Sequence, residues 1–172
     1  MDHSDDLPDD MFLVHVTGED DGTMQKTLSF SRSPTVLLSF AANRFTRAAS
    51  RVYQDKYGLG SMDWRILVML TREPGATVTR ASDMIGIDKG AVSRSLHRLL
   101  DQGLVRQGDL HANGRSRSWR LTGKGQALHA RILEEALTRQ RALFKGFHPE
   151  EITQLCDLLT RFMVNLDDLQ DR

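Results

Sequence analysis

The residues whose types and spacing carry the clearest chemistry lie between Asp88 and Gly103. A helix over 89–102, at 3.6 residues per turn, places apolar side chains on one face: Val92, Leu96 and Leu99, with Leu100 beside them. Its other face and flanks carry polar, charged and small residues: Lys89, Gly90, Ser93, Arg94, His97, Arg98 and Asp101. A helix that packs on one side and offers arginine, a hydroxyl and a glycine on the other is suited to reading the DNA major groove.

A second basic feature follows this helix. Arg115 and Arg117 fall near the tip of an expected hairpin, in which no acid follows Asp109. Taken alone, Arg94 and Arg98 are equally well explained as solvated charges on a surface helix. The cationic hairpin favours the DNA interpretation, because a hairpin beside a groove-reading helix contacts phosphates or an adjacent minor groove.

Charge is distributed unevenly along the 172 residues, although its formal total is zero. Residues 1–34 contain eight acids and two bases, a net charge of −6, whereas residues 77–124 contain nine bases and four acids, a net charge of +5. Because binding to phosphate depends on the local electric field, we expect the second segment to meet DNA.

Composition indicates a cytoplasmic protein without membrane contact. No apolar run approaches the roughly 20 residues that span a bilayer, and the acidic start lacks the basic region of a secretory signal. A single cysteine, Cys156, excludes an internal disulfide and favours a reducing compartment. Because leucines surround it in the sequence, we expect Cys156 to be a small buried side chain rather than a reactive thiol.

Hydrophobic spacing predicts a mainly α-helical chain with one small β-hairpin, in the order H-H-H-H-β-β-H-H. The expected helices span 35–56, 62–72, 79–85, 89–102, 123–145 and from 149 onward, and the expected strands span 104–106 and 118–121. The second helix is expected to bury Trp64, Leu67, Val68 and Leu70. The last helix has a coiled-coil-like seam: Ile152, Leu155, Leu159, Phe162, Leu166 and Leu169.

The first 33 residues are predicted to form an acidic arm that is partly disordered. Within this arm the run 12–16 is either a strand or an anchoring patch. The sequence leaves the role of the arm open.

Several of these motifs together resemble the MarR family of multiple-antibiotic-resistance regulators. The resemblance is carried by Ile87–Leu99, by Gly103-Leu104-Val105 and by the stretch from Gly114-Arg115 to Leu121–Gly125. Residues 63–67, Asp-Trp-Arg-Ile-Leu, are also similar to the second helix of that family. The likeness extends over about residues 35–170, in matching order and spacing.

The resemblance implies a winged helix-turn-helix protein that binds double-stranded DNA as a homodimer. It implies four regions: the arm (1–33), a first dimerisation helix (34–60), the DNA-binding region (61–122) and C-terminal dimerisation helices (123–172). By analogy Arg94 lies on the recognition helix and Arg115 is the wing arginine of the minor groove, steadied in the family by an aspartate where this chain has Asn113.

The same analogy implies a small-molecule effector, typically an aromatic or phenolic carboxylate, in a pocket bordered by Trp64 and Arg65. Core packing is the favoured explanation for Trp64. Because members of the family usually act as repressors, the resemblance implies repression. No catalytic set, cofactor motif or metal-ligand spacing stands out, so an enzyme is not expected. A small enzyme and a winged-helix module that binds protein remain as alternatives.

Overall fold

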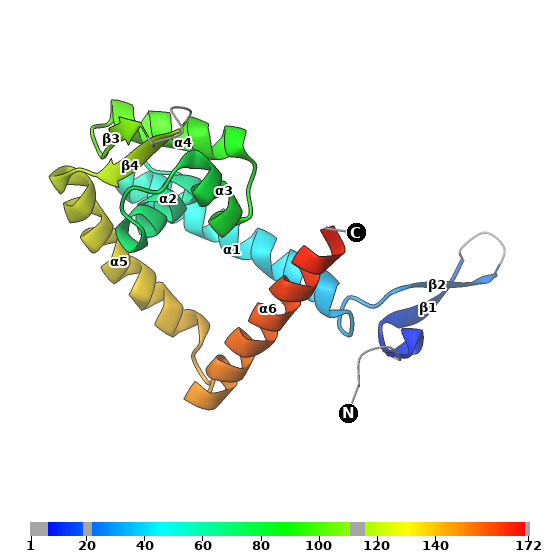
Figure 1. Ribbon diagram of the computed structural model, residues 1–172. Coiled ribbons are helices and arrows are strands. Elements are labelled where there is room, and N and C mark those ends of the chain that lie inside the picture. Colours follow the sequence, from blue (N-terminus) through cyan, green and yellow to red (C-terminus); the bar gives the residue numbers. More distant parts are fainter. Residues whose placement is uncertain (1–6, 19–21, 111–115, 171–172) are drawn as a thin grey trace.

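Six α-helices and two β-hairpins make up the residues that the computed structural model describes, 7–18, 22–110 and 116–170 (Figure 1). The helices are α1 (Pro34–Tyr57), α2 (Ser61–Arg72), α3 (Val78–Ile85), α4 (Lys89–Asp101), α5 (Gly123–Leu143) and α6 (Pro149–Gln170). The strands are β1 (Leu13–Thr17), β2 (Met24–Leu28), β3 (Val105–Leu110) and β4 (Arg117–Leu121), and a short 3-10 helix, η1, spans Asp9–Met11. The expected mainly α fold with a hairpin wing is confirmed.

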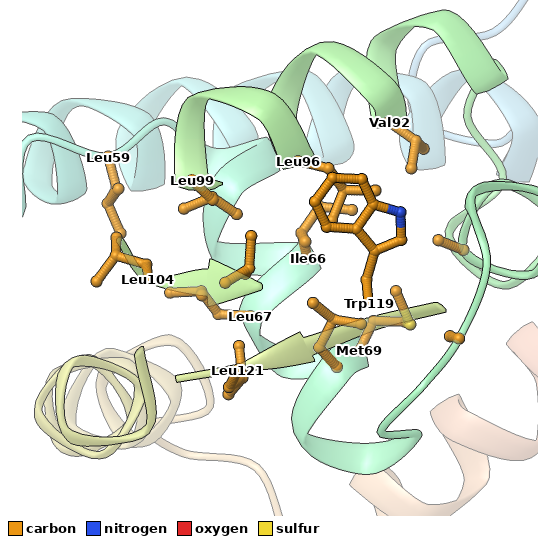
Figure 2. Close-up of a cluster of buried hydrophobic side chains, with 14 of the residues drawn as sticks. Leu59, Ile66, Leu67, Met69, Val92, Leu96, Leu99, Leu104, Trp119 and Leu121 are labelled. Atoms are coloured by element: carbon orange, nitrogen blue, oxygen red, sulfur yellow. The ribbon is translucent and has the colours of Figure 1, made fainter. Parts of the chain in front are cut away.

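The hydrophobic core lies where α2, α4 and the β3–β4 hairpin meet (Figure 2). Leu96 and Leu99 of α4 face Ile66 and Leu67 of α2, and Trp119 of β4 closes the side of the cluster. All five side chains are at least 97% buried. Because the apolar faces of two helices and a hairpin are used up in this core, the opposite face of α4 is left to solvent.

Polar caps fix where the helices of this domain begin. The side chains of Thr77, Asp88 and Thr122 accept backbone hydrogen bonds from Arg80, Ala91 and Gly125 at the starts of α3, α4 and α5. Between α3 and α4, Gly86 adopts a φ of 71°, a left-handed conformation that glycine takes without strain. This tight turn sets the angle between the two helices.

The beginning of α5 is fastened to the end of α4. Thr122 donates from its hydroxyl to the carbonyl of Gly103 at 2.7 Å, and the Lys124 amine donates to the carbonyl of Gln102 at 2.8 Å. A Cβ on Gly125 would collide with the carbonyl oxygen of Leu104. The two backbones therefore touch, and the start of α5 packs directly against the winged domain at this point.

Beyond its first turns α5 leaves the winged domain, and α6 runs back from its far end (Figure 1). Ile132 is fully buried, but farther along α5 Leu143 is 54% exposed. The seam of α6 is only half-buried or exposed within one protomer, and Cys156 is exposed as well, which corrects the expectation of a buried thiol. The reason is that the described elements of the chain leave most of this helix exposed.

Two further expectations were wrong in detail. Leu67 and Leu70 are buried as predicted, but Val68 is 40% exposed, whereas Ile66 and Met69 are buried, because Val68 lies off the stripe that α2 turns toward the core. The wing strands are longer than expected, and their register pairs Val105 with Leu121 and Leu110 with Arg117.

The expected disorder at the chain start falls largely on residues 1–6, which lie outside the described residues.

The N-terminal arm contains a second hairpin. The sequence offered a strand over 12–16 as one of two interpretations and did not predict the strand that pairs with it. Strand β1 pairs antiparallel with β2, with Leu13 opposite Leu28 and Thr17 opposite Met24. The hairpin projects from the start of α1, away from the winged domain (Figure 1). Among the described residues, no helix is long and apolar enough to cross a membrane.

Candidate DNA interface

The exposed side of α4 forms one continuous polar surface. A shallow hollow on this side is lined by Gly90, Ser93, Arg94, His97, Arg98 and Asp101. On the side facing the core, Val92, Leu96 and Leu99 are fully buried and Leu100 is half-buried. The two faces of the expected recognition helix are therefore separated as its spacing predicted.

Gly90 and Arg94 are adjacent on this surface at the N-terminal end of α4. A Cβ on Gly90 would lie 3.2 Å from a guanidinium nitrogen of Arg94 and 3.0 Å from a carboxylate oxygen of Asp88. The glycine thus keeps the helix start open, while Asp88 holds it with a 2.8 Å hydrogen bond from the Ala91 amide. Within the described residues Arg94 forms no ion pair, so its donors are available to a ligand.

His97 links α4 to the wing. Its Nδ1 lies 2.7 Å from the carbonyl oxygen of Ser93, and its ring meets the ring of Trp119 edge-on with centroids 5.8 Å apart. These two contacts fix the imidazole plane. The position of His97 thereby depends on the packing of β4.

Arg98 is held by a buried carboxylate that the sequence analysis did not single out. Its guanidinium donates to Asp63 at 2.7 Å, and the hydroxyl of Ser95 donates to the same oxygen at 2.5 Å. The other carboxylate oxygen of Asp63 accepts from the Gly60 amide at 3.0 Å. One acid therefore caps α2 and fastens α4 to it. The only signal in the sequence was an acid three residues after a helix-starting glycine.

The wing carries a row of exposed arginines on its two strands. Arg117 is exposed near the tip of the hairpin, and Arg106 lies directly opposite Arg120 in the β3–β4 register. In the described part of the chain none of these three arginines forms an ion pair. The predicted wing arginine, Arg115, and its neighbour Asn113 lie outside the described residues.

The predicted effector residues lie where α1, α2 and α5 meet. The ring of Trp64 stacks on His129 with centroids 5.2 Å apart and tilts against Tyr53 at 5.8 Å. Burial lowers the pKa of His129, which keeps its imidazole neutral near pH 7. Arg65 donates to the hydroxyl of Thr46 on α1 at 3.2 Å. Trp64 is half-buried and packs against the hydrophobic core, as the core-packing explanation predicts.

Comparisons with known proteins point to one family of regulators. Residues 57–116 match a sequence profile of the MarR family. The chain is 31% identical over 124 residues to the HTH-type transcriptional regulator PetP of Rhodobacter capsulatus, covering 72% of this chain and 74% of that protein. It is 30% identical over 118 residues to the HTH-type transcriptional regulator PecS of Dickeya dadantii, covering 67% and 70% respectively. A crystal structure of a MarR/EmrR family transcriptional regulator from Acinetobacter sp. ADP1 superposes with a TM-score of 0.75 at 29% identity, over 82% of this chain and 99% of that one.

Proposed function

We propose that this chain binds a pseudo-palindromic operator as a homodimer and represses transcription until a small aromatic or phenolic acid releases it. The chain belongs to the MarR family of DNA-binding transcriptional regulators and is not an enzyme. The family membership rests on the comparisons above. The homodimer, the operator contacts, the repression and the effector are the proposal.

The observation that carries the operator contacts is the exposed face of α4. Arg94 has unpaired donors beside Gly90, whose lack of a side chain permits close approach to a base edge. We assign groove contacts to Lys89, Gly90, Ser93, Arg94, His97 and Arg98, and backbone or minor-groove contacts to Arg115 and Arg117. Bidentate arginine contact with guanine is the commonest specific contact in major grooves.

The uncovered apolar surface of three helices supports the homodimer. Large apolar side chains are exposed on α1, α5 and α6: Leu37, Leu38, Phe40, Phe45, Leu133, Leu137, Leu143, Leu155, Leu158, Met163, Val164, Leu166 and Leu169. Monomeric proteins rarely expose apolar surface of this extent. A twofold dimer that interlocks these helices buries it and places the two copies of α4 for one operator.

The aromatic group around Trp64 supports the effector. Trp64 follows Asp63 directly in α2, and Asp63 holds α4 through Ser95 and Arg98. A ligand that displaces the Trp64 ring therefore acts on the same helix turn that anchors the recognition helix. Trp64 fluorescence should change on titration with a small aromatic acid, and operator affinity should fall reciprocally. A saturable fluorescence change with constant operator affinity would remove the effector from the proposal.

The decisive experiment measures operator binding by fluorescence anisotropy, using a duplex selected by genomic footprinting. Arg94→Ala should weaken binding by about 1–3 kcal/mol and relax the preference at one base pair per half-site. The matched control is Arg141→Ala, which removes another exposed arginine, at the far end of α5. The control should bind as the unaltered protein does.

Two outcomes would contradict this assignment. An equal loss on every duplex would make Arg94 a phosphate anchor, and no loss on any duplex would remove it from the interface. Binding of the unaltered protein should also weaken steeply with salt, by about 10³-fold or more between 50 and 200 mM if six or more phosphates are contacted. A salt-independent interaction would refute DNA binding through this surface.

A further inference from the structure

The N-terminal arm, of which residues 7–18 and 22–33 are described, packs little against the rest of its own protomer. Its two strands pack chiefly against each other, and η1 packs against β1. A single two-stranded hairpin is marginally stable in water at best, because it has no second layer to bury its side chains. The arm nevertheless carries exposed apolar side chains: Met11, Val16, Met24, Leu28 and Phe30.

Polar contacts close the base of the arm, and Ser33 joins it to α1, because the Leu37 amide donates to the Ser33 carbonyl at 3.1 Å. The Ser29 amide donates to the Phe12 carbonyl at 2.7 Å, and the guanidinium of Arg32 donates to the carbonyl of Leu13. Ser29 and Ser33 are 5% and 2% exposed, respectively. The direction in which the hairpin leaves α1 is therefore set by this joint, and it points away from its own winged domain (Figure 1).

The apolar surface of the arm continues onto α1. The ring of Phe30 meets the ring of Phe40 edge-on at 5.2 Å, yet Phe30 stays 69% exposed and Phe40 39% exposed. Leu37, one turn before Phe40, is 45% exposed. This is the surface that the proposed homodimer buries, so a protomer seated on α1 lies directly beside the arm.

Charge also favours a second copy of the chain. Residues 1–34 carry a net charge of −6, whereas α1 carries three exposed arginines, Arg44, Arg47 and Arg51, at helical spacing on the side of Phe40. These arginines form no ion pair within the described part of the protomer. The net charge of this N-terminal segment of the sequence is opposite to that of the arginine row, and this favours association of two copies of the chain.

We infer that the arm is an intersubunit clasp: the β1–β2 hairpin of each protomer packs on α1 and the adjoining helices of the second copy. Met24 and Leu28, which share one face of β2, supply the apolar contact. The inference rests on the proposed homodimer and adds to it a contact outside the interlocked helices. The clasp slows separation of the protomers.

Subunit exchange between unlabelled and ¹⁵N-labelled protein, followed by native mass spectrometry, tests the clasp. Deleting residues 2–28 removes both strands of the hairpin but keeps Ser33 at the start of α1, and it should leave a dimer whose exchange is at least tenfold faster. The double substitution Met24→Asp with Leu28→Asp should have a similar effect. The control, Gln25→Asp, adds a charge on the opposite face of the same strand and should exchange at the rate of the unaltered protein.

A photo-crosslinking phenylalanine analogue at position 30 shows what the arm touches. In mixed labelled and unlabelled dimers, crosslinked peptides should join position 30 of one chain to α1 or α6 of the other. Crosslinks confined to one chain, or an unchanged exchange rate in both the deletion and the double variant, would overturn the clasp and leave the helix-mediated dimer intact. A monomeric unaltered protein in sedimentation velocity at micromolar concentration would instead refute the homodimer itself.

Discussion

Replacing Asp63 with alanine should destabilise the protein more than loss of any exposed ion pair. The side chain of Asp63 is 7% exposed and accepts hydrogen bonds from Gly60, Ser95 and Arg98. Ser95 is fully buried, so loss of its acceptor costs about 1–3 kcal/mol. Loss of the cap at Gly60 adds about 1 kcal/mol. The Arg98 side chain is 53% exposed, so water screens its ion pair and its share is at most about 1 kcal/mol.

The expected total for Asp63→Ala is a loss of about 2–5 kcal/mol in the free energy of unfolding. Arg98→Ala should cost less, about 1 kcal/mol, because it leaves two donors on the carboxylate and removes no buried partner. Ser95→Ala should also cost about 1 kcal/mol, and the double variant Asp63→Ala with Ser95→Ala should be more stable than the sum of the single losses predicts.

Urea unfolding at one fixed protein concentration measures these differences, since the stability of a dimer depends on concentration. Glu73→Ala is the matched control, because it breaks an ion pair with Arg80 in which both side chains are more than a third exposed. The control should lose less than about 1 kcal/mol. An Asp63→Ala protein as stable as this control, or an Arg98→Ala protein less stable than Asp63→Ala, would refute the assignment of Asp63 as the anchor of α4.

Three further outcomes are expected. Arg106→Glu turns the like-charged pair with Arg120 into an ion pair across the wing strands and should raise stability by about 0.2–1 kcal/mol, measured by urea unfolding; no gain would mean that the two side chains do not interact. Burial lowers the pKa of His129, so on acidification the unfolded chain takes up this proton first, and stability present above about pH 6.5 is lost as the pH falls. His129→Gln should flatten that pH dependence between about pH 7 and pH 5, and an unchanged profile would assign it to other groups. Arg115→Ala should weaken operators with A·T-rich flanks most and flatten the salt slope by about one unit in anisotropy titrations; unaltered affinity and slope would show that the wing never touches DNA.

The sequence predicted helix boundaries best, because each boundary depends on a few neighbouring residues. Asp88 caps the start of α4 and Gly86 ends α3, because a cap and a left-handed turn depend on neighbouring residues alone. The exposure of Val68 was missed because several stripes of α2 are apolar, and only the position of α4 decides which of them is buried. Cys156 was misjudged for a related reason, since spacing predicts an apolar seam on α6 but not which chain covers it.

No local sequence rule predicts that Asp63 anchors α4. Asp63 and Ser95 are 32 positions apart, and neither residue type is unusual for its helix. The strand β2 was missed because its residues, Met24–Leu28, alternate too weakly in polarity to indicate a strand without the partner that pairs with it.

Because the backbone of Gly125 packs directly against that of Leu104, a change in the angle of α5 moves the winged domain with it. With 21 residues at 1.5 Å each, the helix is about 31 Å long, close to the roughly 34 Å between successive major grooves on one side of DNA. A tilt of about 5° where α5 meets a second protomer would displace the winged domain at its other end by about 3 Å. In the proposed homodimer, a bound effector would therefore not need to deform α4, because a slight change of angle between the two protomers would shift the two copies of α4 relative to the major grooves of the operator.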